Sequence, residues 1–437
     1  MIRRFFSKPV SEACAMLKHV LRLLNAQRDL LSPQALAAVQ LKLDELDAAL
    51  AEKANAGKVR IKTEELQFAA EKWIKPYPHA AWRENVEVLL VALAVAMAIR
   101  TFFIQPFKIP TGSMQPTLFG IVSTPDFNMV VGRAEYFERA AASGYEIPDA
   151  AKIALKAEAA QQAQLEKAIV IPGGWERVKE WFQGISYLHV VAPADGTIDG
   201  VGRMSKFLIF NLKQTISIGG ATQTMWFPPD YGEEDLAHRA GLLPGRVYKK
   251  GEDVIKMRIS AGDHLFVDRL TYNFRKPERG EIIVFQTGGI PEEARDHFNI
   301  PNDQFWIKRL VALPGEHVQI GDDRHLIING NRLDASTPHF ADVYGFNPAT
   351  PPRDSHYSGH VNGTVDKEDH LLPGLAPLFP DAGTVFTNGD YSDLVMGDNT
   401  CNSLDSRSWG SFAAQSVVGK SLFVYWPLTR RFGWGNE

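Results

Sequence analysis

The sequence predicts a mostly β domain, α+β overall, that follows an N-terminal helical segment and one transmembrane helix. Three patterns predict it. A 19-residue apolar run, Val86–Ile104, divides the chain; apolar residues recur at helical spacing before it; and short β-rich runs separated by Gly, Pro, Asn and Asp follow it. With 437 residues, 45% of them hydrophobic, the chain has enough apolar material for more than one core.

Charge and cysteine content exclude several classes of protein. The net charge of −4 and the pI of about 6.3 give no basic field that would attract nucleic acid. The two cysteines, Cys14 and Cys401, provide neither a disulfide framework nor a CxxC zinc pattern. Because the chain has no basic field, we expect no nucleic-acid partner.

Residues 1–82 are predicted to form a helical segment. Apolar residues recur three and four apart in Ala13–Leu24, and Ser32-Pro33 starts a second helix, Ala35–Ala54. We expect these two helices to pack as a small hairpin. The alternative is a peripheral membrane helix over Arg3–Leu24.

The apolar run is long enough to cross a membrane. As a helix, 19 residues extend about 28 Å, close to the ~30 Å of a hydrocarbon core, and Val88–Ile99 carry no charge. We therefore expect a transmembrane helix over residues 83–104; the alternative is the buried core helix of a soluble protein. Lys72, Lys75 and Arg83 precede the run within about a dozen residues, so the positive-inside rule places residues 1–82 in the cytoplasm.

The part of the chain after the apolar run is predicted to be rich in β-strands. Seven runs have strand-like composition: His264–Leu270, Glu281–Gln286, Gln304–Ala312, Val318–Ile320, Leu326–Ile328, Leu394–Met396 and Val417–Trp426. Helical spacing is clear only in Arg133–Ala168 and Trp175–Phe182. We expect a mostly β domain with inserted segments.

A first short motif, Pro110–Leu118 (PTGSMQPTL), lies just beyond the apolar run. Its Thr-Gly-Ser-Met stretch between two prolines predicts a fixed turn, in which Gly112 lets another backbone approach closely. Taken alone, Ser113 in such a turn is more often a capping or turn residue than a nucleophile.

A second motif places a lysine among apolar residues. In Phe305–Glu316 (FWIKRLVALPGE), a strand puts Trp306, Lys308 and Leu310 on one face. Burial disfavours the charged ammonium, and lowering its pKa from about 10.4 to near 7 costs about 4–5 kcal/mol. A protein tolerates that cost for a general base. The alternative is an edge-strand lysine that reaches solvent.

The third motif, Met396–Gly410 (MGDNTCNSLDSRSWG), is a loop dense in short polar side chains that hydrogen-bond their own backbone. Asp405 and Arg407 are expected to pair. A calcium loop is the competing interpretation, but the oxygens do not follow EF-hand spacing and Arg407 would repel a cation. Together the three motifs indicate a serine nucleophile, a lysine base and a loop that orients the lysine.

With GDHLFVDRLTY (Gly262–Tyr272) and RGEIIVF (Arg279–Phe285), these motifs resemble bacterial type I signal peptidase, a family of membrane-bound Ser/Lys leader peptidases. The resemblance covers Val86–Leu118 and Gly262–Val424, apart from a variable subregion at about 334–384. The largest departure is length, because about 140 residues separate the first motif from the Gly-Asp strand.

The resemblance implies roles for five residues of the motifs. Ser113 matches the nucleophile and Lys308 its general base. Ser403 matches the serine that hydrogen-bonds this base, and Asp405 and Arg407 match the pair that shapes the site behind it.

The resemblance also implies how the transition state and substrate are held. The Ser113 backbone N–H and the Thr111 hydroxyl would form the oxyanion hole, although a serine is common at the Thr111 position in the family. Met114 and Pro110 are expected to line the substrate pockets. The implied chemistry needs no metal and no cofactor.

The resemblance implies four parts of the chain. Residues 1–82 are cytoplasmic, residues 83–104 span the membrane, residues 105–118 and 262–437 form a β-rich Ser/Lys peptidase domain, and residues 119–261 form an inserted α+β module. We expect the insert to be a lineage-specific extension; the alternative is a regulatory or partner-binding module.

The implied function is removal of N-terminal signal peptides from exported preproteins through an acyl-enzyme. The implied location is the bacterial cytoplasmic (inner) membrane, with a single pass, the catalytic domain on the outer face, and preproteins and the lipid bilayer as partners. One alternative is a soluble, self-cleaving Ser/Lys regulator of the repressor type, against which the apolar span argues. Another is an anchored binding protein with relic motifs, against which intact Ser113, Lys308 and Ser403 argue.

Overall fold

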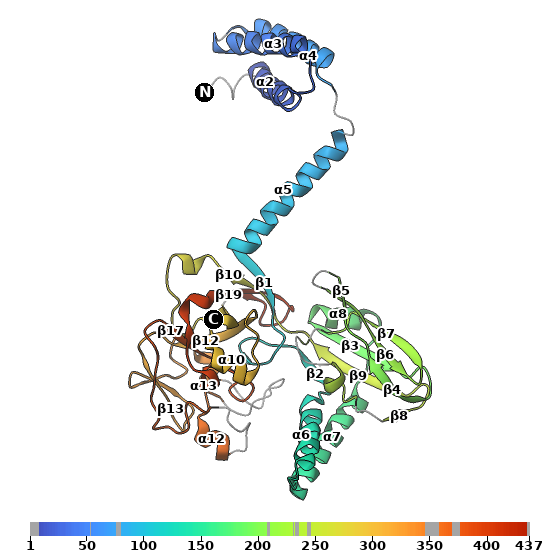
Figure 1. Ribbon diagram of the computed structural model, residues 1–437, viewed down its shortest axis with the longest axis vertical. Coiled ribbons are helices and arrows are strands. Elements are labelled where there is room, and N and C mark those ends of the chain that lie inside the picture. Colours follow the sequence, from blue (N-terminus) through green and yellow to red (C-terminus); the bar gives the residue numbers. More distant parts are fainter. Residues whose placement is uncertain are drawn as a thin grey trace. The chain divides into compact units, whose positions relative to one another are not determined.

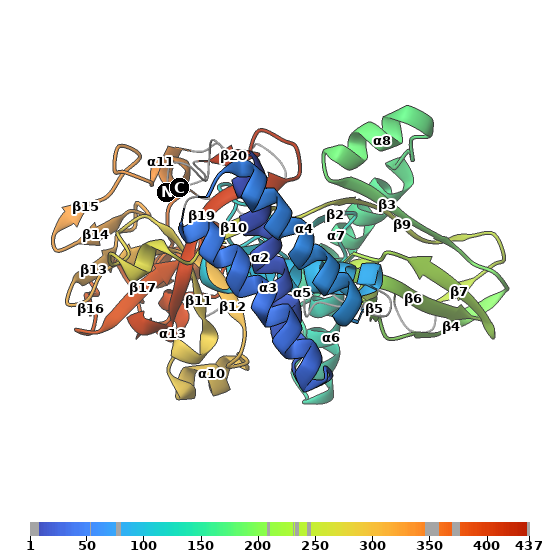
Figure 2. The same ribbon diagram turned by 90° about the horizontal axis from the view of Figure 1, so that it is seen from above.

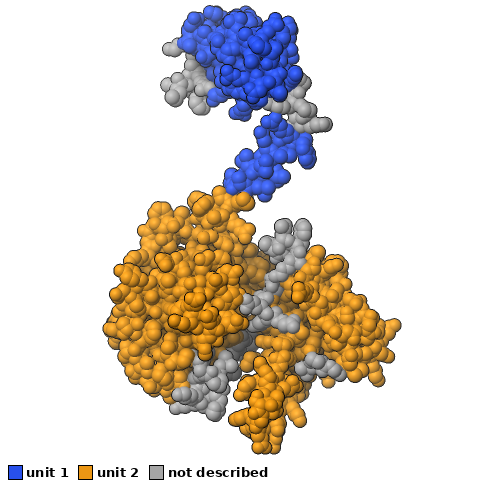
Figure 3. Space-filling view, viewed as in Figure 1, with its two compact units in different colours: residues 1–95 blue, residues 96–437 orange. Residues whose placement is uncertain are grey.

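The computed structural model describes residues 8–52, 54–75, 80–207, 210–229, 231, 236–242, 246–345, 358–368 and 376–434. The chain divides into two compact units, residues 1–95 and residues 96–437, which are coloured separately in Figure 3. The first residues of the alternative membrane helix at Arg3–Leu24 lie outside the described residues, as do parts of the expected variable subregion.

The first unit contains three packed helices, α2 (Lys8–Ala26), α3 (Pro33–Ala51) and α4 (Ala56–Trp73) (Figure 1). The expected two-helix hairpin is therefore wrong in the number of helices. The reason is that α4 buries only Val59 and Leu66, so its charged sequence shows little apolar periodicity. The N-terminus of α3 is as expected, because the Ser32 hydroxyl accepts a hydrogen bond from the Ala35 N–H.

Helix α5 (Ala80–Phe102) is long and apolar enough to cross a membrane, by length and composition. Its segment Trp82–Phe102 has a mean hydropathy of 1.8, and none of its most apolar stretch is buried within the structure. The structure therefore gives no support to a buried core helix. The helix ends two residues before the expected boundary because Ile104 begins strand β1 (Ile104–Lys108).

The second unit is built on an eight-stranded antiparallel sheet in the order β1-β10-β19-β11-β12-β17-β18, with β20 beside β19. The strands after β1 are β10 (His264–Asp268), β11 (Ile282–Gln286), β12 (Phe305–Ala312), β17 (Ser392–Met396), β18 (Phe412–Ala413), β19 (Val417–Trp426) and β20 (Gly433–Trp434). Strand β1 pairs with β10, so the chain that leaves α5 enters the sheet at once.

A smaller sheet and several short helices complete this part of the unit. The sheet has the order β15-β14-β13-β16. Its strands are β13 (His317–Ile320), β14 (Leu326–Ile328), β15 (Asn331–Arg332) and β16 (Phe386–Thr387), and the helices and 3-10 turns are η1 (Thr271–Asn273), η2 (Thr287–Gly289), α10 (Glu292–Phe298), α11 (Ala341–Gly345), α12 (Gly363–Glu368), α13 (Ser406–Trp409) and η3 (Ala414–Ser416). All seven expected strands are confirmed, with boundaries that differ by up to two residues.

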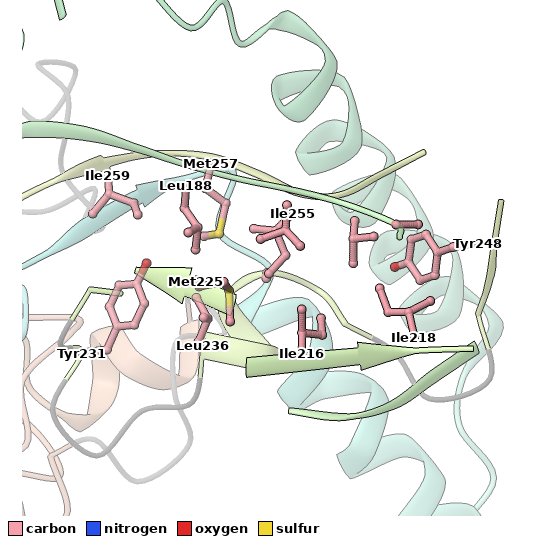
Figure 4. Close-up of a cluster of buried hydrophobic side chains, with 14 of the residues drawn as sticks. Leu188, Ile216, Ile218, Met225, Tyr231, Leu236, Tyr248, Ile255, Met257 and Ile259 are labelled. Atoms are coloured by element: carbon pink, nitrogen blue, oxygen red, sulfur yellow. The ribbon is translucent and has the colours of Figure 1, made fainter. Parts of the chain in front are cut away.

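The inserted segment forms two small antiparallel sheets with a common core (Figure 4). One sheet has the order β2-β9-β3, and the other has the order β5-β6-β4-β8 with β7 beside β6. The strands are β2 (Val122–Thr124), β3 (Ile185–Val191), β4 (Gly196–Val201), β5 (Ser205–Phe207), β6 (Phe210–Ile218), β7 (Ala221–Trp226), β8 (Val247–Tyr248) and β9 (Asp253–Ser260). Apolar side chains such as Leu188, Ile216, Met225 and Ile255 fill the space between the sheets.

The insert also carries four helices, α6 (Asn128–Ala142), α7 (Asp149–Ala168), α8 (Gly174–Phe182) and α9 (Leu236–Arg239). The single helical segment expected at Arg133–Ala168 is therefore two helices. The chain breaks at Gly144, which has a φ of 80°, and α7 restarts after Pro148.

The insert leaves and rejoins the larger sheet region at neighbouring points. Strands β2 and β9 pair with Val122 opposite Ser260, so the two ends of the insert lie side by side. Just outside the two ends of the insert, the Ile109 N–H donates to the Asp263 carbonyl, and the Asp263 N–H donates to the Phe119 carbonyl. The residues before and after the insert are thus joined directly by backbone hydrogen bonds.

Candidate active site

The first motif forms a tight turn directly after β1. The Gln115 N–H donates to the Gly112 carbonyl at 3.1 Å, and Leu118 N–H donates to the Met114 carbonyl at 3.0 Å. The peptide between Thr111 and Gly112 packs against Gly120 so closely that a Cβ there would collide with it. The turn that presents Ser113 therefore depends on a glycine that follows it in the sequence.

The expected dyad is brought together by the fold. Lys308, on β12, donates from Nζ to Ser113 Oγ at 2.8 Å, across 195 residues of sequence. Both residues are 5% exposed. Strand β12 lies between β11 and β17, so the lysine projects from an interior strand of the sheet and not from an edge strand. The alternative of a solvent-reaching edge lysine is wrong.

The surroundings of Lys308 favour its neutral form. The pKa of Lys308 is lowered to about 8, mainly by burial and in small part by nearby Arg407, although the carboxylates of Asp405 and Asp398 act in the opposite direction. With that pKa, about a tenth of the lysine is neutral at pH 7, against roughly 3 in 10,000 for an ordinary lysine. An amine that is neutral and hydrogen-bonded to a serine hydroxyl is able to accept its proton.

The third motif holds the backbone on both sides of the serine. The Asn399 N–H donates to the Ser113 carbonyl at 3.0 Å, and Asn399 Nδ2 donates to the Gly112 carbonyl at 3.0 Å. Asn399 is not among the predicted site residues, because an asparagine in a polar loop carries no signal of which distant backbone it will contact.

A buried ion pair joins the three motifs, and it too was missed. Arg309, next to Lys308 on β12, donates from Nε and Nη2 to the two carboxylate oxygens of Asp398 at 2.8 and 2.7 Å. The Thr117 hydroxyl donates to the same carboxylate at 2.5 Å. Both charged side chains are fully buried. The sequence does contain one sign of this ion pair. Arg309 is a charged residue between apolar neighbours in a central strand, and such a residue requires a partner of opposite charge.

The expected pairing of Asp405 and Arg407 is confirmed. Arg407 donates from Nε and Nη2 to the two Asp405 oxygens at 2.9 Å each, and both side chains are fully buried. Arg407 also donates to the Thr400 hydroxyl and carbonyl at 2.8 Å, and the Gly397 N–H donates to Asp405 at 3.0 Å. Burial opposes the charged carboxylate, but Arg407 outweighs it and holds the pKa of Asp405 below its usual value.

Ser403 lies near the turn that carries Ser113, but its expected hydrogen bond to Lys308 is not formed in this structure. Its hydroxyl is buried, and among the described residues it makes no hydrogen bond to Lys308. It lies against Gly397, where a Cβ would collide with both the Ser403 hydroxyl and the Ser113 carbonyl. The structure thus places Ser403 behind the nucleophile turn and leaves its contact with the base as a prediction.

The two expected oxyanion donors have no other acceptor. In the part of the chain that the structure describes, neither the Thr111 hydroxyl nor the Ser113 N–H donates a hydrogen bond. Thr111 is exposed and Ser113 is buried, so the two donors lie where the turn meets solvent. Their binding of an oxyanion stays a prediction.

The residues expected to line the substrate pockets differ in exposure. Met114 is fully buried in an apolar cluster that includes Leu118, Leu265 and Val284, whereas Pro110 is half-buried. Their contact with substrate stays a prediction. Among the described residues, no group of three or more His, Cys, Asp and Glu side chains is arranged to hold a metal ion.

One known protein family matches this chain over two segments. The signal peptidase family, peptidase S26, matches residues 82–133 and 255–426, about half of the chain, and the chain belongs to this family. The match includes both halves of the dyad and the third motif, and it leaves residues 134–254 of the insert unmatched.

Individual relatives are similar over the same region. The chain is 30% identical over 172 residues to signal peptidase I of Leptolyngbya laminosa, which covers 39% of this chain and 64% of the relative. It is 29% identical to thylakoidal processing peptidase 1 of Arabidopsis thaliana, and the alignment covers 39% of each chain. It is 30% identical to signal peptidase IB of Staphylococcus aureus, and that alignment covers 34% of this chain and 67% of the relative. The chain thus spans less than two thirds of several curated relatives.

Among solved structures, a signal peptidase I from Enterococcus faecalis is 27% identical, with 33% of this chain and 97% of that chain covered and a TM-score of 0.21.

The ion pair that joins the motifs predicts a non-additive effect on stability. Arg309→Met or Asp398→Leu alone is expected to lower the free energy of unfolding by about 3–5 kcal/mol, because each leaves the other charge buried without a partner. The double variant is expected to lose clearly less than the sum of the two single losses. Denaturant titration of the detergent-solubilised chain measures all three, and additive losses would contradict the pairing.

Proposed function

We propose that this chain is a membrane-anchored serine endopeptidase that removes N-terminal signal peptides from exported preproteins by a Ser/Lys dyad mechanism. The observation that carries the proposal is the 2.8 Å hydrogen bond between buried Lys308 Nζ and Ser113 Oγ. Membership of the signal peptidase family supports the choice of substrate.

The chemistry follows from the dyad. Neutral Lys308 accepts the Ser113 proton while Oγ attacks the carbonyl carbon at the cleavage site, and a tetrahedral intermediate forms. The lysine then gives this proton to the leaving amine as the peptide bond breaks, which leaves an acyl-enzyme. Water, deprotonated by Lys308, attacks the ester, and the serine recovers its proton when the carboxylic acid departs. No step requires a metal or a cofactor.

The oxyanion is expected to form next to the free donors of the turn. The Ser113 N–H and the Thr111 hydroxyl have no other acceptor in the described structure, so neither has to break a hydrogen bond to reach it. Donors fixed in this way are each worth roughly 3 kcal/mol in the transition state. Ser403, Asp405 and Arg407 support the dyad from behind.

The substrate is expected to bind as an extended chain beside β1. This strand is at the end of the order in its sheet, and it leads directly into the turn that carries Ser113. Its outer backbone groups are therefore available to pair with a peptide. Pro110, in that turn, and Met114 would contact the residues just before the cut.

The proposed location follows from α5 and from charge. The helix anchors the chain in the bacterial cytoplasmic membrane, with the more basic N-terminal segment in the cytoplasm and the peptidase domain on the outer face. Preproteins emerging in the bilayer would then meet the site at the membrane surface.

Loss of either dyad member is expected to abolish cleavage. Ser113→Ala removes the nucleophile, and Lys308→Arg replaces the base with a group that stays protonated near neutral pH. Cleavage of a signal-peptide-bearing preprotein in detergent micelles, followed by gel shift and N-terminal sequencing, measures both. The exposed Lys250→Arg is a matched control and should cleave at the wild-type rate. Activity in Lys308→Arg would remove this lysine as the base.

The hydroxyl of Thr111, but not its methyl group, is expected to contribute to kcat. Thr111→Ala should lower kcat by about two orders of magnitude, since one oxyanion donor is lost, whereas Thr111→Ser keeps the donor and should stay near the wild-type rate. KM should change little in both variants. Equal kcat values for the three proteins would dismiss Thr111 from the oxyanion hole.

A further inference from the structure

Helix α8 of the insert has a strongly two-sided sequence, GWERVKEWF. With 3.6 residues per turn, its four large apolar side chains fall within an arc of about 120°. These are Trp175, Val178, Trp181 and Phe182. Glu176 and Glu180 lie on the opposite side, so the helix has one apolar face and one acidic face.

The orientation of α8 is the reverse of that of an ordinary surface helix. On the acidic side, Glu180 accepts a hydrogen bond at 2.8 Å from the hydroxyl of Tyr187, which belongs to β3 of the insert. On the apolar side, Trp175 is 76% exposed and Val178 is 41% exposed, and no residue of the helix is buried. A helix of a soluble domain buries its apolar face and exposes its charges, so the exposed face of α8 needs another apolar environment.

The charges beside the apolar face are basic. Arg177 and Lys179 each lie just outside the apolar arc, one on either edge. This is the arrangement of helices that lie in a membrane interface, where Trp side chains sit at the level of the headgroups and basic side chains reach anionic phosphates. Lys179 also pairs with Glu176 of the same helix at 3.3 Å, and both side chains are exposed.

Helix α8 is attached to the end of β19 in the larger sheet. The rings of Trp181 and Trp426 lie 5.0 Å apart, and the Leu428 N–H donates to the Phe182 carbonyl at 3.1 Å. Trp426 ends β19 opposite His264 of β10, and His264 pairs with Lys108, at the end of β1 that is away from α5. Figure 2 shows α8 at the outer margin of the insert, beside β3.

The apolar surface continues on the segment after β19. Leu428 is 48% exposed, Phe432 46% and Trp434 72%. The Leu428 N–H, which donates to the Phe182 carbonyl, joins this segment to α8.

We propose that α8 lies in the membrane–water interface with Trp175, Val178, Trp181 and Phe182 in contact with lipid. The inserted module is then a second membrane contact of the chain, next to the sheet that carries the dyad. The proposal rests on the proposed transmembrane anchor, because α5 is what brings this surface to a bilayer.

The test measures contact between α8 and lipid in the full-length chain. A polarity-sensitive fluorophore is attached to Val178→Cys in a Cys14→Ser, Cys401→Ser background, and the chain is reconstituted in phosphatidylethanolamine–phosphatidylglycerol vesicles with brominated acyl chains. The matched control is the label at Glu176→Cys on the acidic face. Bromine should quench the label at position 178 at least threefold more than the label at position 176. Equal quenching at the two positions would overturn the proposal.

One further label, one double variant and a cross-linking experiment separate the remaining outcomes. A label at Ala94→Cys within α5 should be strongly quenched; if it is not, the anchor itself fails and the proposal for α8 falls with it. Adding Arg177→Gln and Lys179→Gln should reduce quenching at position 178 at least twofold in these anionic vesicles. Disulfide cross-linking between two copies at position 178, without quenching, would identify a second copy as the occupant and contradict contact with lipid.

Discussion

The site depends on one ammonium group that is kept out of water. Lowering the pKa of Lys308 from 10.5 to about 8 corresponds to about 3 kcal/mol that the rest of the protein must offset. The apolar sheet supplies the burial, and the buried pairs Arg309–Asp398 and Asp405–Arg407 fix the backbone around the lysine. A carboxylate in direct contact with Lys308 would raise the pKa of the lysine again, because an ion pair favours the charged ammonium.

Much of the fold and the main residues of the site were predictable from the sequence. Strands are recognised by short β-rich runs between turn residues, and all seven expected strands are confirmed because each contributes its own apolar side chains to a core. The pairing of Ser113 with Lys308 was predictable because the two motifs make chemical sense only together. Asp405 and Arg407 were predictable because they are two residues apart in one loop.

The rest depends on contacts between segments that are distant in the sequence. Asn399 holds the carbonyls of Gly112 and Ser113 across more than 280 residues, and nothing local to an asparagine indicates that partner. Helix α4 was missed because its burial is slight. Helix α8 is held by contacts with distant residues, among them Tyr187, Trp426 and Leu428. Amphipathic spacing predicts that a helix has two faces, but it does not predict which face the protein covers.

The most direct test of the account is the pH dependence of kcat/KM for cleavage of a preprotein, which reports the ionisation of the free enzyme. Because burial lowers the pKa of Lys308, the neutral base becomes available as the pH rises through that value. The account predicts a rate that increases tenfold per pH unit below about pH 7 and levels off with a midpoint near 8. A rate that continues to increase to a midpoint near 10.5 would show an ordinary, solvated lysine and would contradict the account.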